Sequence, residues 1–229
     1  MIGGSAFREC EALLEIRLPD GLKEIGSDAF SGCRSLRQIT VPVGVKCIET
    51  AVFQSCRALQ EVHLPEGLEQ IGMFAFEDCD TLTRIVLPAS LKRLCRGAFE
   101  NCTSLLEAQL PDGLEELQDD AFEYCRSLQK VTIPAQVRQI ERAAFYYCQS
   151  LQEVQLPEEL NKIGEDAFAH CWALKRIVIP AGVEKVGEHA FWECYSLQNI
   201  AVLSDDTEIA EDAFEDCPGT VKRGTGSLF

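Results

Sequence analysis

The feature that most constrains the fold of this chain is a phenylalanine that returns every 23 residues. It occupies ten positions at that spacing: Phe7, Phe30, Phe53, Phe76, Phe99, Phe122, Phe145, Phe168, Phe191 and Phe214. A fixed period of this length without insertions indicates a solenoid, in which each repeat packs on its two neighbours. We therefore expect one solenoid domain over 1–229, with about ten repeats of 23 residues.

Each repeat combines a strand pattern with a turn pattern. Written from Leu36, one repeat reads LRQITVPVGVKCIETAVFQSC. Its first part alternates like a half-buried strand, which places Ile39 and Val41 inward. Proline then ends the pairing, because it has no N–H to donate, and a second short extended segment follows. The A-F-x-x-C part spaces phenylalanine and cysteine about one helical turn apart, which predicts a short helical turn with both side chains inward.

The repeats LPDGLKEIGSDAFSGCRSL at 18–36 and LPEELNKIGEDAFAHCWAL at 156–174 resemble the BspA-like, or treponemal-type, leucine-rich repeat family. The resemblance implies a β-rich parallel solenoid. We expect about nine short strands in a parallel sheet on the concave face, with short second strands and short helical turns on the other sides. The resemblance also implies bacterial surface or secreted proteins that are often implicated in adhesion, and it implies no enzymatic residues.

Charge and hydropathy narrow the class of partner. The net charge is −16 at pH 7, so the chain repels phosphate backbones and anionic lipid, and we expect no nucleic-acid partner. No apolar run approaches the roughly 20 residues that span a bilayer, so we expect no membrane insertion. The start, MIGGSAFREC, lacks the pattern of a signal peptide. We expect the native full-length protein at the cell surface or secreted, with a cytoplasmic location left open.

The chain has twelve cysteines, ten of which follow the phenylalanines at the same period. Ligands at one repeat position form a line, whereas zinc needs four that converge, so we expect no metal site and no cofactor. Equivalent Cβ atoms in stacked repeats point in parallel, about 4.8 Å apart, which is unfavourable for disulfides. We predict a ladder of reduced, buried thiols that act as small hydrophobes, with Cys47 and Cys95 outside it.

All tyrosines and tryptophans lie between 124 and 195 and flank the A-F-x-x-C turns. With one histidine in the same positions they form the candidate partner-binding set: Tyr124, Tyr146, Tyr147, His170, Trp172, Trp192 and Tyr195. Clustered aromatic rings suit recognition of a protein, because they offer a large contact area at low entropic cost. The alternative is that the rings pack over neighbouring turns and close the convex side. The second candidate site is the polar concave strand face, with Gln109, Lys130, Thr132, Gln155 and Arg176.

The solvent-facing strand positions alternate in charge along the stack: Glu61, Arg84, Glu107, Lys130, Glu153 and Arg176. Side chains one strand apart then carry charges of opposite sign. We interpret this alternation as a feature that helps the repeats to stack, rather than as a strip that binds a partner.

The ends of the chain differ from the repeats. Residues 203–229 lose the proline and glycine of the repeat, which predicts a degenerate C-terminal cap with a last strand around Val221. Ile2 and Gly3 align with Ile25 and Gly26, so the chain begins inside a repeat. We expect either a truncated chain or self-association of this uncapped end through Ala6, Phe7, Leu13 and Leu14.

No nucleophile–base arrangement, P-loop or dinucleotide motif is present, so we expect no enzyme activity. The resemblance to the BspA-like family implies a protein-binding module of a bacterial surface or secreted protein. The alternative is a structural or oligomerisation scaffold within a larger protein.

Overall fold

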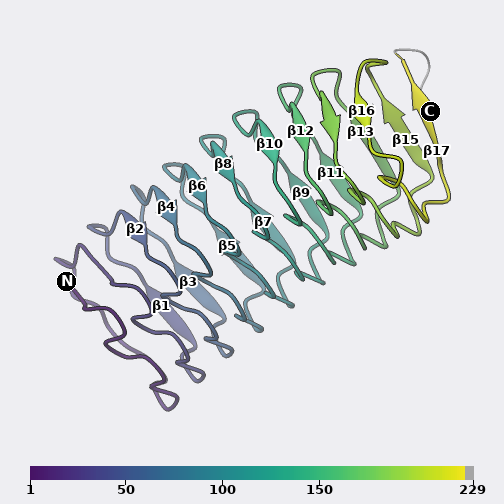
Figure 1. Ribbon diagram of the computed structural model, residues 1–229. Coiled ribbons are helices and arrows are strands. Elements are labelled where there is room, and N and C mark those ends of the chain that lie inside the picture. The colour runs from purple at the N-terminus through teal and green to yellow at the C-terminus, as the bar shows by residue number, and fades with distance from the viewer. Residues whose placement is uncertain (225–229) are drawn as a thin grey trace.

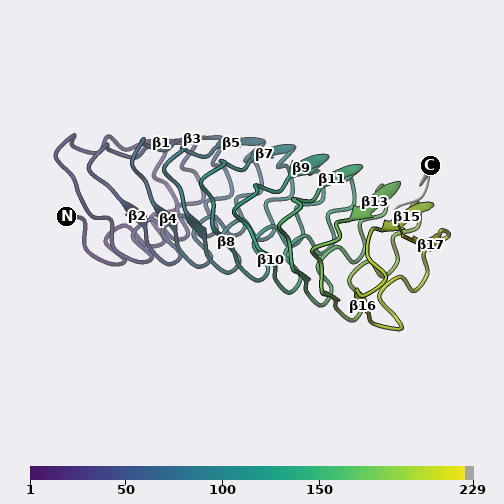
Figure 2. The ribbon, with the colours of Figure 1, turned by 90° about the horizontal axis from the view of Figure 1, so that it is seen from above.

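The computed structural model describes residues 1–224, which form a stack of similar coils running from the N-terminal to the C-terminal end (Figure 1). Two rows of short strands lie on opposite sides of the stack, and the coils rotate gradually along it (Figure 2). All strand pairs are parallel. The β solenoid expected from the repeat is therefore confirmed.

The first row contains the longer strands, and we call it the long-strand face. It consists of β1 (Gln38–Thr40), β3 (Glu61–His63), β5 (Arg84–Val86), β7 (Glu107–Gln109), β9 (Lys130–Thr132), β11 (Glu153–Gln155), β13 (Arg176–Ile179), β15 (Asn199–Val202) and β17 (Thr220–Arg223). Residues one repeat apart are paired, as in Ile39 with Val62. The middle residue of each three-residue strand points inward, so the alternation read from the sequence sets the buried face.

The second row contains the two-residue strands that follow the proline. It consists of β2 (Cys47–Ile48), β4 (Gln70–Ile71), β6 (Arg93–Leu94), β8 (Glu116–Leu117), β10 (Gln139–Ile140), β12 (Lys162–Ile163), β14 (Lys185–Val186) and β16 (Glu208–Ile209). In β2 to β14 the second residue is buried, and it packs into the core opposite the long-strand face. Short extended segments at this point of the repeat are as expected.

The core is a column of stacked phenylalanine rings. Neighbouring rings from Phe7 to Phe214 have centroids 5.0–5.7 Å apart, and their planes differ by at most 19°. The eight rings from Phe30 to Phe191 are fully buried. Each ring therefore needs the coils on both sides to exclude water, which couples the repeats.

The A-F-x-x-C segments are turns and not helices, and the predicted helical turn is wrong. No helix occurs among residues 1–224. In the turn around Phe30, the N–H groups of Asp28 and Phe30 donate to carbonyls of the next coil, at 2.9 Å each. The N–H of Ala29, between them, donates within its own turn to Gly26. An α-helix would use all of these donors internally, whereas here every second donor ties neighbouring coils together.

The cysteine thiols also connect neighbouring coils. Cys56 Sγ donates to the carbonyl oxygen of Phe30 at 3.2 Å, and the same bond recurs for every ladder cysteine from Cys33 to Cys217. All twelve cysteines are free. The ladder is buried from Cys33 to Cys194, but the prediction of burial is wrong at its ends, because Cys10 is exposed and Cys217 is half-buried where a neighbouring coil is missing or shortened. Burial raises the pKa of the Cys33 thiol to about 11 and that of the deeper ladder thiols well above the ordinary value. Protonated thiols are poor nucleophiles, so these side chains act as small core residues.

The last coil is shorter than the others. Strand β17 pairs with β15 at an offset of 21 residues, and it supplies the strand expected around Val221. Gly219 permits this offset, because a Cβ there would lie 2.6 Å from the backbone oxygen of Gln198. Residues 225–229 of the predicted cap lie outside the described residues.

The first coil is joined to the second by a parallel bridge between Ile2 and Ile25, as their alignment in the repeat suggests. Self-association through this coil stays a prediction. Among residues 1–224 no helix is long and apolar enough to cross a membrane.

Candidate functional site

The candidate residues lie on the turn edge, which we define as the row formed by the A-F-x-x-C turns. The residue two places after each phenylalanine has a left-handed backbone, with φ of 57° at Tyr124, 57° at Tyr147 and 60° at His170. Bulky residues rarely adopt this conformation. Because the same position is left-handed in every coil from Glu9 to Asp216, the conformation belongs to the fold, and the side chains along it can vary.

The seven candidate residues form one connected group, which we call the aromatic cluster. Tyr147 is central: its ring centroid lies 5.1 Å from that of Tyr124, 4.1 Å from that of His170 and 6.1 Å from that of Trp172. Further contacts join the remaining rings: Tyr146 to Tyr147 at 4.9 Å, His170 to Trp192 at 4.7 Å and Trp172 to Tyr195 at 6.3 Å. The sequence predicted the shared columns, and the structure brings all seven residues together across four coils.

Exposure divides the aromatic cluster into an inner and an outer part. His170 is only 4% exposed, and Tyr124, Tyr146, Tyr147 and Trp192 are half-buried. Tyr195 is 53% exposed and Trp172 38% exposed. The inner rings cover the turns beneath them, as expected if the rings close the convex side of the solenoid. The outer pair leaves apolar ring area open to solvent.

His170 is an unusual member of the cluster. Its Nδ1 lies 3.0 Å from a carboxylate oxygen of Glu193, but the orientation does not satisfy a hydrogen bond. Among residues 1–224, this Nδ1 is a buried side-chain atom that has no hydrogen-bond partner. A buried polar group without a partner costs free energy, so it marks a place where the fold has not completed its own polar contacts.

In the N-terminal turns, arginines pair with carboxylates between neighbouring coils. Arg8 lies 3.5 Å from Asp28, and Arg34 lies 3.3 Å from Glu11. The most buried of these carboxylates belongs to Asp120, which is 2% exposed. It accepts from Arg96 at 2.9 Å and from Arg142 at 2.8 Å. These pairs compensate part of the negative charge on this part of the turn edge.

Next to these pairs, three glutamates stack on successive coils: Glu77, Glu100 and Glu123. Burial, and then the neighbouring carboxylates, raise the pKa of Glu100 and that of Glu123 to about 7 each. The Gln54 amide donates to the Glu77 carboxylate at one end of the stack. Tyr124 and Tyr146 follow at the other end, so the carboxyl stack borders the aromatic cluster. Sequence reasoning missed this stack, although its 23-residue spacing is visible in the printed chain.

The long-strand face, the second candidate site, carries charges that neutralise one another. Arg84 lies 3.3 Å from Glu107, and Glu153 lies 3.4 Å from Lys130 and 3.2 Å from Arg176. Hydrogen bonds from Lys130 and then its positive charge lower the pKa of Glu153. The register pairs Arg84 with Glu107, Glu107 with Lys130, and Lys130 with Glu153, as the alternation predicts.

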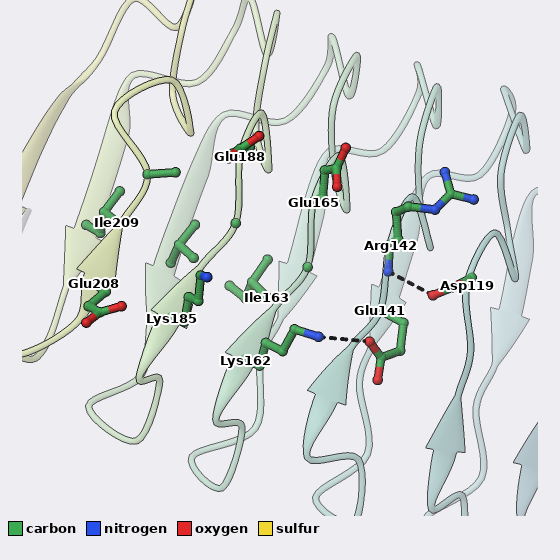
Figure 3. Close-up of a pocket in the computed structure, with 14 residues that line it drawn as sticks. Asp119, Glu141, Arg142, Lys162, Ile163, Glu165, Lys185, Glu188, Glu208 and Ile209 are labelled. Carbon is green, nitrogen blue, oxygen red and sulfur yellow. Dashed lines mark hydrogen bonds and ion pairs between the residues drawn. The ribbon is translucent and has the colours of Figure 1, made fainter.

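A groove runs along the second strand row near its C-terminal end (Figure 3). Lys162 and Lys185 line one side, and Glu165 and Glu188 lie on the other. Lys162 is already paired with Glu141 at 3.2 Å. Gly164 makes the coils fit closely here, because a Cβ on it would lie 2.8 Å from the backbone carbon of Glu141. The groove combines charges of both signs with the apolar side chains of Ile163, Val186 and Ile209, and sequence reasoning did not single it out.

Among residues 1–224, no group of three or more His, Cys, Asp or Glu side chains is arranged to hold a metal ion.

Comparisons with known proteins agree with the solenoid fold and with the repeat family that the sequence resembles. The family described as BspA type Leucine rich repeat region matches residues 1–106 and 96–221. A crystal structure of a T. pallidum leucine-rich repeat protein is similar, with 32% identity and a TM-score of 0.64, over 69% of this chain and 76% of that chain. A leucine-rich cell surface protein from Faecalibacterium prausnitzii shares 29% identity with a TM-score of 0.61, over 99% of this chain and 70% of that chain.

The pneumococcal vaccine antigen PcpA is similar in fold alone, at 18% identity and a TM-score of 0.52, over 88% of this chain and 60% of that chain. A search among curated proteins found no match.

Proposed function

This chain belongs to the BspA-type leucine-rich repeat family, and from this premise we propose that it is a non-enzymatic protein-binding module of a bacterial surface or secreted protein. We propose that it recognises host or cell-surface proteins through the aromatic cluster. The observation that carries the proposal is the outer pair, Trp172 and Tyr195, which exposes ring area on a rigid row of turns.

The backbone supports this use of the rings. Left-handed turns tied to the next coil hold Tyr147 and His170 in fixed positions, so little conformational entropy is lost when a partner binds. Buried rings beneath the outer pair support it as packed neighbours support the anchors of known interfaces. The long-strand face offers no comparable anchor, since its charges are already paired.

The relatives support an extracellular location. The Faecalibacterium prausnitzii relative is named a cell surface protein, and its match covers nearly all of this chain. We therefore propose that the native protein lies outside the cell, with adhesion as its role.

The test is a binding screen against extracellular-matrix proteins with the double variant Trp172→Ala/Tyr195→Ala. We expect the variant to lose at least about tenfold in affinity, since exposed aromatic anchors carry much of the binding free energy. The matched control is Met73→Ala/Val86→Ala, which removes two exposed apolar side chains elsewhere. Equal binding by the wild type and the double variant would favour the alternative, a scaffold that does not use the cluster.

A further inference from the structure

We infer that the aromatic cluster and the carboxylates around it bind an arginine-containing segment of the partner protein. This inference rests on the proposed function and adds the chemistry of the partner. It is carried by the way charge is distributed along the turn edge.

Arginine disappears from the turns where the exposed rings lie. Six of the first seven turns contain an arginine, from Arg8 to Arg142. The last three turns, at 164–173, 187–196 and 210–219, contain no lysine or arginine. The same three turns contain eight carboxylates: Glu165, Asp166, Glu188, Glu193, Glu211, Asp212, Glu215 and Asp216.

The ion pairs follow this difference. In the first turns, carboxylates pair with arginines of neighbouring coils, as Asp120 does with Arg96 and Arg142. Within residues 1–224, the ion pairs of the eight C-terminal carboxylates are made with histidine only. His170 meets Glu193 at 3.0 Å, and His189 meets Asp212 at 3.4 Å. These pairs are charged only when the histidine is protonated. Glu165 and Glu188 lie across the groove from Lys162 and Lys185, so the negative charge of these turns is compensated only in part.

Carboxylates and exposed rings lie together at this end of the cluster. A hydrogen bond with the Glu193 carboxylate is the first cause that raises the pKa of Tyr195 to about 12, and the negative charge of Asp216 contributes. Glu193 also faces His170 Nδ1, the buried atom that has no hydrogen-bond partner among the described residues. The polar contacts of His170, beside Glu193, are therefore incomplete among the described residues.

A guanidinium group suits this combination better than other cations do. It stacks on aromatic faces and donates two parallel hydrogen bonds to a carboxylate, whereas an ammonium is a compact point charge. The protein itself makes such a contact at the other end of the cluster, where Arg126 lies 5.7 Å over the ring of Tyr124. In the two coils that carry Trp172 and Tyr195, these rings occupy the repeat position of Arg126. Among residues 1–224, the cation–π contacts lie at Phe74 and Tyr124 and not at these two rings, which leaves their faces open to a cation of a partner.

The test uses defined peptides in place of the unidentified partner. Acetylated and amidated Gly-Ser-Arg repeats are titrated into the full chain by calorimetry, with lysine and glutamate versions of the same length. We expect the arginine peptide to bind about fivefold or more tightly than the lysine peptide, and the glutamate peptide not to bind. The affinity of the arginine peptide should fall as salt is raised from low to high concentration.

Two variants with the same change of charge make the test specific. Glu188→Gln/Glu193→Gln/Asp216→Asn removes three carboxylates of the arginine-free turns and should weaken the arginine peptide about tenfold. Glu11→Gln/Asp28→Asn/Asp80→Asn removes three arginine-paired carboxylates and should change its affinity less than about twofold. Equal weakening by both variants would overturn the inference, because it would show attraction by net charge alone.

Two further outcomes would also overturn it: equal binding of the arginine and lysine peptides, or displacement of the arginine peptide by an equal concentration of spermine, which would indicate a site for small polycations. The inference and the proposed function fail separately. If no peptide binds while a matrix protein still binds in a manner lost in Trp172→Ala/Tyr195→Ala, the aromatic recognition stands and the arginine chemistry is wrong.

Discussion

The turn edge of this solenoid has two regions built on one core. Around Phe30, the two residues after the phenylalanine are Ser31 and Gly32, which are small and buried, and arginines pair with the carboxylates nearby. Around Phe168 and Phe191 the turn carries exposed Trp172 and Tyr195 over a buried histidine, His170, and the carboxylates lack arginine partners among the described residues. Beneath both regions the phenylalanine stack has nearly the same spacing, 5.2 Å at Phe7–Phe30 and 5.2 Å at Phe168–Phe191.

The comparison shows that core positions and surface positions of the turns are under different packing constraints. An inward residue must fit between two other coils, so every copy faces the same constraint. An outward residue on the same turn contacts solvent and one or two neighbours, and its identity is free to change. Binding chemistry can therefore be placed on any turn without altering the stack beneath it.

The largest effect is expected where the regions are alike. Phe76→Ala and Phe168→Ala should each lower the free energy of unfolding by about 3–5 kcal/mol, because each leaves a cavity in the ring column. Chemical denaturation monitored by circular dichroism measures both. Costs that differ by more than about 2 kcal/mol would show that the two regions do not share one core.

The second prediction concerns ion pairing of the carboxylates, a property in which the two regions differ. Arg96→Ala/Arg142→Ala leaves the buried Asp120 carboxylate without its arginine partners, and we expect a loss of about 2 kcal/mol in the free energy of unfolding. Glu188→Gln/Glu211→Gln alters the C-terminal carboxylates and should change it by less than about 0.5 kcal/mol. Denaturation curves of equal midpoint for the two variants would contradict the difference in pairing.

A smaller effect concerns the carboxyl stack between the regions. The pKa values of Glu100 and Glu123 are raised to about 7 in the folded protein, above those of an unfolded chain. The folded state therefore binds these protons more tightly, and the stability that they contribute is fully present below about pH 4.5 and is lost as the pH rises through about 7.

Glu100→Gln/Glu123→Gln mimics the protonated pair. Because both groups are partly exposed, we expect a gain of only about 1 kcal/mol at pH 8 and a smaller gain at pH 5. Melting temperatures across that range measure it. The prediction fails if the wild type and the variant differ by the same amount at both pH values.

A similarly small effect on stability is expected at the outer rings. Trp172→Ala/Tyr195→Ala removes side chains that are 38% and 53% exposed, and the melting temperature should fall by only a few degrees. A fall as large as that of a core variant would mean that the outer pair covers the turns and is not free for a partner.

The sequence predicted the fold well because the same pattern occurs in every repeat, so an uncertain assignment in one copy is settled by the others. Ten copies of the phenylalanine and cysteine spacing indicate which residues point inward, and Ile39 and Val41 are buried as the alternation predicts. The helical turn was wrong because phenylalanine and cysteine three residues apart fit a helix and this turn equally well. Only the left-handed backbone at positions such as Asp28 distinguishes them, and no glycine signals it there.

The residues of the candidate site could be predicted from the sequence, but their burial and their ion pairing could not. Shared columns grouped Tyr124 with Tyr147, and Trp172 with Tyr195, before any contact was known. Burial within the group was not predictable: His170 is enclosed by Tyr146, Tyr147 and Trp192 because these side chains converge from neighbouring coils. The lack of arginine partners around Glu193 likewise depends on which side chains reach across coils.

The most direct test of the account exchanges outward residues between the two regions. Tyr147→Ser, Trp172→Arg and Tyr195→Arg install, at the C-terminal turns, the residues that occupy the same repeat positions at Ser55, Arg34 and Arg57. Binding of this triple variant to the extracellular-matrix proteins that the wild type binds is measured by surface plasmon resonance. We predict that the variant keeps a cooperative unfolding transition and loses binding by about tenfold or more. Unchanged binding by the folded variant would contradict the claim that the outward residues of the C-terminal turns carry recognition.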